Sequence, residues 1–222
     1  MKKKILITLL IILLFIIIYF VYINLSFKSV LKNTINYESK INYSTIIELN
    51  LNNKSKNSKM IYDIKKSSNI KKVNIIYYIN NKRVNNIDKY IIFSNNKQDT
   101  YVLNNKKYEK QKKSDDFYLN YELLNKTSVL FKKNNKYTLV MKAYDAYNLI
   151  YNKQVIEKEK LNYYIIVIVE ANKEYYINKI EYNINNINKS SDDNNILNYK
   201  VLIKNKNINN HDKIILPFNL NK

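Results

Sequence analysis

Few side chains in this sequence have the types and the spacing that chemistry requires. His211 is the only histidine, and the chain has no cysteine and no glycine. A nucleophilic triad would need a distant serine to meet His211 and its neighbour Asp212, and the polar segment around them favours a surface position. A structural zinc site needs several histidine or cysteine ligands, and a phosphate-binding loop needs glycines. The sequence therefore predicts no metal, no cofactor and no enzyme activity.

Three pairs of acidic residues could each bring two carboxylates to one site. Asp115-Asp116 fits the start of a helix, Asp192-Asp193 fits a loop, and Glu157 lies two positions before Glu159. None has the spacing of a calcium-binding loop, which also requires a central glycine. A glycosidase needs only two carboxylates that lie close together in space. The spacing of these pairs does not favour a glycosidase site.

Apolar side chains, in contrast, recur at spacings that gather them on single surfaces. Every second residue from Ile41 to Leu51 is isoleucine, leucine, tyrosine or threonine, which is typical of a strand with one buried face. Such faces, with one predicted helix, supply the candidate wall of an apolar binding site: Ile47, Leu49, Tyr62, Ile64, Ile75, Tyr77, Phe117, Tyr121 and Leu124. A solid core has the same pattern, so both interpretations stay open.

The same two-residue alternation predicts a sheet of about ten strands. They are expected over residues 41–51, 59–65, 73–79, 89–94, 100–103, 107–112, 137–141, 163–170, 176–184 and 196–204. The run from Tyr163 to Val169 is apolar on both faces, which is typical of a central strand that is covered on both sides or partly covered by a helix. Residues 189–195 are expected to form an exposed hairpin loop. Asparagine pairs such as Asn80-Asn81 and Asn134-Asn135 separate the alternating segments, and asparagine is the best substitute for glycine in turns.

Three helices are predicted, over residues 26–36, 115–131 and 143–152. In the second, Ser114 or Asp115 can cap the first turn, and the acidic residues there suit the helix dipole. Its apolar stripe recurs with helical spacing and consists of Phe117, Tyr121, Leu124, Ser128 and Phe131. Because no long low-complexity linker interrupts the chain, the elements predict a single antiparallel α+β domain.

The N-terminal sequence predicts a membrane anchor. Lys2, Lys3 and Lys4 precede an uncharged run from Ile5 to Ile23, which is 19 residues long. About 20 helical residues cross a hydrocarbon core, and the run lacks both a small-residue cleavage site and a lipid-accepting cysteine. The basic flank predicts a cytoplasmic N-terminus. We therefore expect a retained transmembrane helix over residues 1–25 and an extracytoplasmic domain over residues 26–222, in a single-pass protein of the bacterial plasma membrane.

The charge of the chain is strongly positive, with 38 Lys and Arg against 18 Asp and Glu, a net +20. Arg83 is the only arginine, whereas arginine is the residue best suited to recognise phosphates and guanine. Asparagine, lysine, isoleucine and tyrosine also have A/T-rich codons, so composition bias explains part of the surplus. The sequence predicts a solvated lysine-rich surface, with anionic lipid head groups or wall polymers as alternative partners, and no nucleic acid.

In the order of its elements the chain resembles the lipoprotein-carrier superfamily of LolA- and LppX-like extracytoplasmic proteins. The matching parts are the helix that leads into residues 39–51, the hairpins through Lys112, the helical insert, the run Tyr175–Tyr182 and the end at Ile214–Pro217. The resemblance implies a strongly curved antiparallel sheet, a half-barrel, packed on two or three helices, with lipid or acyl chains bound in its hollow. The chain departs from the lipoprotein members because it lacks their lipidated cysteine.

Two hypotheses follow for the outer domain. In the first, it is a binding module that holds a lipid or another apolar ligand in the hollow of the curved sheet. In the second, it has a solid core and is a non-catalytic structural or interaction protein, whose basic surface binds a partner protein or an anionic polymer of the cell envelope. The packing around Tyr77, Phe117 and Tyr121 would discriminate between them.

Overall fold

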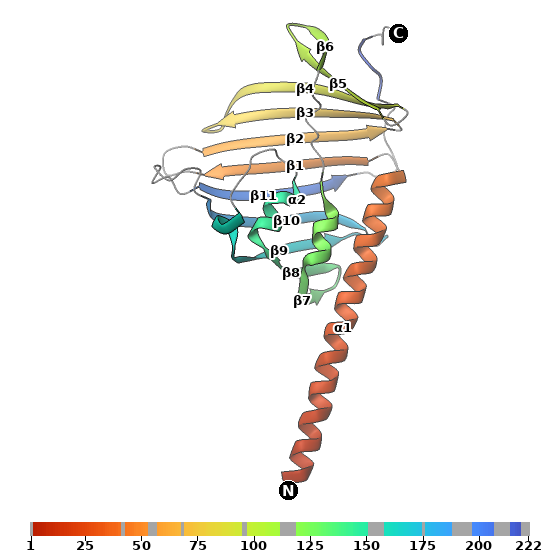
Figure 1. Cartoon of the computed structure of the whole chain (residues 1–222), viewed down its shortest axis with the longest axis vertical. Coiled ribbons are helices and arrows are strands. Elements are labelled where there is room, and N and C mark those ends of the chain that lie inside the picture. The colour runs from red at the N-terminus through yellow and green to blue at the C-terminus, as the bar shows by residue number, and fades with distance from the viewer. Residues whose placement is uncertain are drawn as a thin grey trace.

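The computed structural model describes residues 2–40, 43–52, 57–67, 69–94, 97–111, 119–150, 158–174, 176–187, 197–206 and 214–218. One long N-terminal helix leads into an eleven-stranded sheet that is covered in part by short helices (Figure 1). The helical elements are α1 (Lys2–Lys40), α2 (Ala143–Leu149) and the 3-10 helices η1 (Tyr121–Lys126) and η2 (Lys158–Leu161). The predicted α+β class is confirmed.

The strands follow one another mostly as hairpins. The first six are β1 (Tyr43–Asn52), β2 (Asn57–Ser67), β3 (Ile70–Ile79), β4 (Lys82–Ser94), β5 (Lys97–Asn104) and β6 (Lys107–Gln111). The others are β7 (Ser128–Lys133), β8 (Lys136–Lys142), β9 (Tyr164–Ala171), β10 (Ile177–Ile187) and β11 (Leu197–Lys206). The ten predicted strands all occur, with shifted ends, and β7 is the strand that the alternation did not predict.

All pairings between these strands are antiparallel, in the order β6-β5-β4-β3-β2-β1-β11-β10-β9-β8-β7. The first and the last strands of the chain, β1 and β11, pair in the middle, so two meanders join into one sheet. The sheet is open, because its edge strands β6 and β7 lie at opposite ends of this order. We call these ends the β6 edge and the β7 edge.

Side chains on one face of the sheet form rows that cross several strands. Ile47 on β1 lies opposite Tyr62 on β2 and Ile203 on β11, and Tyr62 lies opposite Ile75 on β3. These residues join side chains from α1, η1 and α2 in one hydrophobic core. We call this side of the sheet the inner face and the opposite side the outer face.

Helix α1 has two parts with different surroundings. Residues 4–22 are all exposed, whereas Ile23, Phe27, Val30 and Leu31 are almost completely buried in the domain core. Their spacing places them on one stripe of the helix. The predicted helix over residues 26–36 is confirmed, and it continues the anchor helix without a break across the predicted domain boundary after residue 25.

Asparagine takes the left-handed backbone positions that glycine usually occupies. Asn80 and Asn81, in the turn from β3 to β4, have φ angles of 48° and 63°. Asn105 and Asn134 lie in the β5–β6 and β7–β8 turns, with φ angles of 44° and 54°. Asparagine tolerates this region better than most residues. The predicted role of these asparagines in turns is confirmed.

Among the described residues of the helix predicted over 115–131, only residues 121–126 are helical. Residues 121–126 form the short η1, and residues 128–133 form β7, which pairs with β8. Thr127 ends the helical turn, since its backbone N–H and its hydroxyl both donate to the carbonyl of Leu124 (3.2 and 2.8 Å), and its own backbone is extended. Pairing with β8 then outweighs the helical spacing of the stripe. The predicted start of this helix, with Asp115 and Asp116, lies outside the described residues.

The sequence predicts that strand β9 is covered on both sides or partly covered by a helix. In the structure, its outer face is open. Val167 and Val169 are fully buried on the inner face, but Tyr164 and Ile166 are 66% and 48% exposed on the outer face. No described helix packs on that outer face. The predicted central position of the strand is confirmed, and of the two alternatives for its cover, cover on both sides is wrong.

The remaining predictions are tested only in part, because some of their residues lie outside the described ones. The helix predicted over residues 143–152 begins at Ala143 and ends at Leu149. The segment 214–218 is described but forms no strand. The predicted loop 189–195, His211 and the acidic pair Asp192-Asp193 lie outside the described residues, as does Glu157, whereas Glu159 is exposed in η2.

Candidate ligand-binding face

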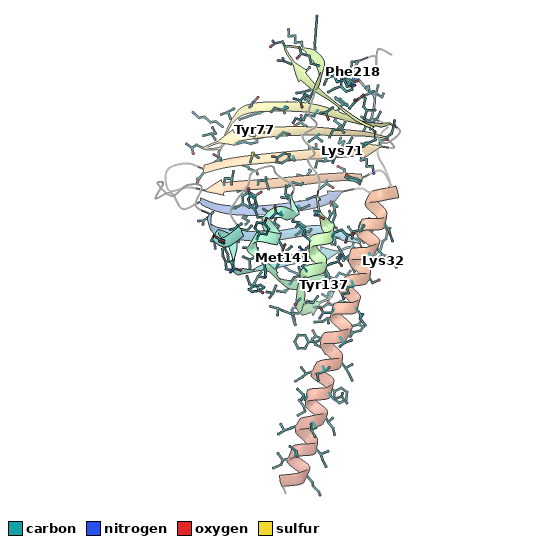
Figure 2. All side chains as sticks on the ribbon, in the orientation of Figure 1. Lys32, Lys71, Tyr77, Tyr137, Met141 and Phe218 are labelled. Atoms are coloured by element: carbon teal, nitrogen blue, oxygen red, sulfur yellow. The ribbon has the colours of Figure 1, made fainter. Side chains whose placement is uncertain are left out.

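The sheet brings eight of the nine predicted wall residues together on its inner face or against it. Ile47 and Leu49 are fully buried, and the core also holds Tyr62, Ile64, Ile75, Tyr121 and Leu124. Tyr77 is partly buried and packs against the same core, and Figure 2 shows it on the upper half of the sheet. Phe117 lies outside the described residues. Their gathering is observed, and their contact with a ligand stays a prediction.

The two halves of the inner face differ in how much contact the helices make with them. The described helices make their main contacts with β7, β8 and β10, on the half of the sheet near α1 (Figure 1). On the other half, the apolar rows continue over β2, β3 and β4. There Met60, Tyr77 and Ile87 are only partly buried, and Met60 lies directly opposite Tyr77. This is the part of the core that an added apolar molecule could reach.

Tyrosines give the inner face hydroxyl groups among its carbon atoms. Burial raises the pKa of Tyr62 to about 12, and the neighbouring Tyr77 adds to the shift. Burial also raises the pKa of Tyr182 and of Tyr199 well above the usual value of 10. The Tyr182 hydroxyl donates to the carbonyl of Ala146 (2.8 Å) and so ties α2 to β10. These side chains stay neutral at physiological pH, so the face carries polar atoms without charge.

Asn205 on β11 holds the helical insert against the sheet, and no sequence pattern indicated it. Its side-chain amide N–H donates to the Tyr121 hydroxyl (2.9 Å) and to the Ile177 carbonyl (2.7 Å). Its side-chain oxygen accepts from the Thr45 hydroxyl (2.8 Å). One residue thereby links η1, β1 and β10. Buried polar groups require such partners, so this cluster fixes where Tyr121 lies.

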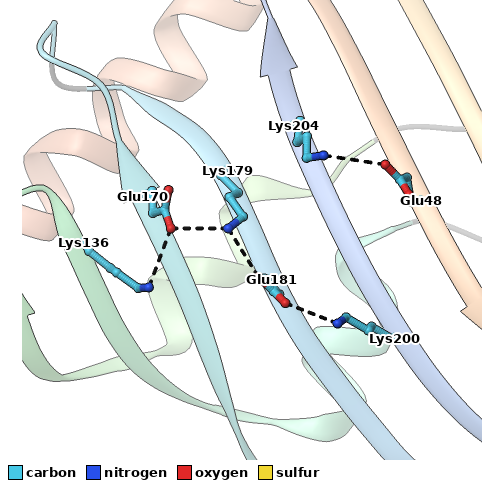
Figure 3. A network of polar contacts seen from close by, with 7 residues as sticks. All are labelled: Glu48, Lys136, Glu170, Lys179, Glu181, Lys200 and Lys204. Carbon is cyan, nitrogen blue, oxygen red and sulfur yellow. Dashed lines mark hydrogen bonds and ion pairs between the residues drawn. The ribbon is translucent and has the colours of Figure 1, made fainter.

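The outer face has a polar centre built from alternating charges (Figure 3). Lys179 lies 3.4 Å from Glu170 and 3.3 Å from Glu181, and the series continues through Lys136 and Lys200. A second group joins Glu48 to Lys59 (2.8 Å) and Lys204 (3.7 Å). The hydrogen bond from Lys59 lowers the pKa of Glu48, against the effect of its partial burial, and the charges of both lysines lower it further. Five lysines thus face three glutamates, so much of the local lysine surplus is neutralised.

An open hollow of about 570 Å³ lies on the outer side of β9 and β10. Its lining includes Tyr164, Ile166 and Ile168 at one side and Glu181 and Asn183 at the other. Among the described residues, no group of three or more histidines and acidic residues is placed to hold a metal ion. The hollow therefore offers an apolar wall and a polar wall.

Comparisons with known proteins find a likeness only among solved structures. No family model matches the chain, and no curated protein matches it. Among the solved structures, a DUF1329 family protein from Desulfovibrio piger is similar, with 10% identity over 86% of this chain and 93% of that chain and a TM-score of 0.31. A likeness at this level carries no argument about function, which must come from the geometry of the chain itself.

Proposed function

We propose that this chain is a membrane-anchored extracytoplasmic binding protein, which holds a lipid or another apolar ligand against the inner face of its curved sheet. The supporting observation is the partly buried margin of the core on β2, β3 and β4. Met60, Tyr77 and Ile87 present apolar surface there, beyond the strands on which the described helices mainly pack. The tyrosine hydroxyls would meet the polar end of an amphiphilic ligand. We propose a binding role without catalysis.

The anchor part of the proposal rests on α1. It is the one described helix long and apolar enough to cross a membrane. Its exposed stretch from Ile5 to Tyr22 is 18 residues long, which gives about 27 Å of helix and matches a hydrocarbon core. The basic N-terminal flank favours a cytoplasmic N-terminus in a bacterial plasma membrane. A fixed anchor restricts the domain to the surface of one membrane, so its ligand would be taken from that membrane or delivered to it.

A photoactivatable fatty acid, incorporated into membranes that contain the full-length protein, tests the proposal. After illumination and digestion, ligand binding by the sheet predicts labelled peptides from strands β2 to β4, in addition to those from the exposed part of α1. The variant Tyr77→Asp places a carboxylate on the inner face and should abolish sheet labelling. Tyr78→Asp is the matched control, since the neighbouring side chain points to the opposite face of the same strand.

The two labelled regions separate the parts of the proposal. Label on α1 but none on strands β2 to β4, equal in all three proteins, would leave the anchor in place and would contradict ligand binding by the inner face of the sheet. The alternative role, in which the basic surface binds an anionic envelope polymer or a partner protein, predicts that result. Absence of label from α1 would contradict the anchor itself.

A further inference from the structure

The β7 edge carries exposed apolar side chains that the domain itself does not cover. Leu130 and Phe131 on β7 are 45% and 51% exposed. Phe131 lies opposite Thr138 on the outer face, and the pairing has a bulge at Leu130. Two strands further, Tyr164 and Ile166 continue the same face on β9. An exposed apolar edge strand is normally an aggregation hazard, which soluble proteins avoid with charges or covering segments.

Helix α1 determines where this edge lies along the membrane normal. The exposed stretch ends at Tyr22, and the next residue, Ile23, is fully buried, so no linker separates the anchor from the domain. Asn24 accepts a hydrogen bond from the backbone N–H of Val129 (3.2 Å), and the Lys132 ammonium lies 5.4 Å from the centre of the Tyr22 ring. The first residues of β7 are therefore level with the last residues of the proposed membrane span.

The charges on the two strands at this edge, β7 and β8, have a single sign. Residues 128–142, which form β7, its turn and β8, contain four lysines and no acidic residue. Lys133 and Lys136 are exposed in the turn region, although Lys136 also pairs with Glu170. Lysines near an anionic membrane surface contribute about 1 kcal/mol each to binding. Apolar side chains beside lysines, at the level where a membrane span ends, fit an anionic lipid head-group layer.

We propose that Leu130, Phe131, Tyr164 and Ile166 form a docking surface for the anionic lipid layer of the same membrane that α1 spans. The inference rests on the anchor that we propose for α1 and is independent of ligand binding in the sheet. The apolar side chains would enter the boundary between head groups and acyl chains, to a depth of about 5–10 Å. The open hollow beside Tyr164 and Ile166 lies on the same surface. Docking gives β9 its missing second cover and fixes the tilt of the domain.

Depth-dependent fluorescence quenching tests this proposal in the full-length protein. The chain has no tryptophan, so one introduced tryptophan reports from a single place. Phe131→Trp and Tyr164→Trp probe the docking surface, and Phe15→Trp probes the middle of the span. Leu103→Trp is the matched control, because Leu103 is an exposed apolar residue (39%) near the opposite edge of the sheet. Each variant is placed in nanodiscs of phosphatidylglycerol and phosphatidylcholine with bromine at a known depth on the acyl chains.

We expect shallow bromines to quench Phe131→Trp and Tyr164→Trp several-fold more than Leu103→Trp, and deep bromines to quench Phe15→Trp most. Two results would overturn the proposal. If Phe15→Trp is quenched while both surface probes behave like Leu103→Trp, the anchor holds and the docking surface does not exist. If Phe15→Trp is not quenched either, α1 does not span the membrane and the docking surface loses its basis.

Discussion

The two edges of the sheet are each held by one end of the described chain, but in different ways. At the β7 edge, α1 packs Phe27 against Tyr137, with ring centres 5.3 Å apart, and Phe27 is only 3% exposed. At the β6 edge, Phe218 of the C-terminal segment lies on the rings of Tyr101 and Tyr108, at 4.9 and 4.8 Å. Figure 1 places these two ends of the chain at opposite ends of the molecule.

The difference lies in what happens to the outer face. Near the β6 edge, the chain covers its own aromatic side chains, and Tyr90 is only 4% exposed beneath this cluster. Near the β7 edge, Phe131 and Tyr164 are left open to the surroundings. The contrast teaches that the aromatic cluster near the β6 edge is closed by protein, although Leu103 there stays 39% exposed, whereas the aromatic rings near the β7 edge are left open beside the helix that we propose as the membrane anchor.

The largest effect is expected where α1 holds the β7 edge. Phe27→Ala removes a buried ring between helix and sheet and should lower the free energy of unfolding by about 3–5 kcal/mol. Leu25→Ala is the control, since Leu25 on the same helix is 61% exposed and its truncation should change stability little. Urea unfolding of the full chain in a non-ionic micelle, followed by near-ultraviolet circular dichroism, measures both. Equal losses for the two variants would show that α1 does not pack on the sheet through this face.

A matched pair of phenylalanines compares the two outer surfaces directly. Phe218→Ala should cost about 1–2 kcal/mol of stability, because the partly buried ring covers two tyrosines. Phe131→Ala should change the free energy of unfolding in micelles by less than about 0.5 kcal/mol, because its ring has little protein around it. The same urea titrations measure this pair. A larger loss for Phe131→Ala would mean that the β7 edge is closed by protein and would remove the contrast.

The smallest effect concerns the polar centre between the edges. Glu48→Gln should lower stability by up to about 1 kcal/mol at neutral pH, since Glu48 pairs with Lys59 and Lys204. The pKa of Glu48 is lowered from 4.5 in the folded state, so its stabilisation is present above pH 4.5 and is lost as the pH falls through the folded-state value. Unfolding titrations of both proteins across this range should therefore converge in acid. A difference that persists at low pH would contradict the role of the ion pairs.

Most of the fold could be predicted because local patterns and tertiary structure agree. The alternation around Ile47 and Tyr62 predicts strands, and the strand pairing places both residues on one face. Asparagine pairs such as Asn80-Asn81 mark turns, because a chain without glycine has few other residues for left-handed backbone positions. The uncharged N-terminal run also predicts a long helix, because the length and composition of the run are local properties of the sequence.

The remaining features depend on contacts between distant segments. Thr127 ends a helical turn and β7 then pairs with β8, so a stripe with helical spacing becomes a strand. Asn205 holds Tyr121 through a hydrogen bond between residues 84 positions apart, and the lysine-rich run around it gives no sign of this role. The apolar outer face of β9 was visible in the sequence, but its environment depends on where α1 places the sheet. The gathering of apolar residues on one face could be predicted, and the polar contacts that support it could not.

Native mass spectrometry of the full-length protein, released from lipid nanodiscs, tests ligand binding most directly. The proposal predicts that one lipid stays bound to the wild-type protein and to the Tyr78→Asp variant after the surrounding lipids are removed, and that Tyr77→Asp loses it. Retention of the same lipid by all three proteins, or by none of them, would contradict a binding site on the inner face of the sheet.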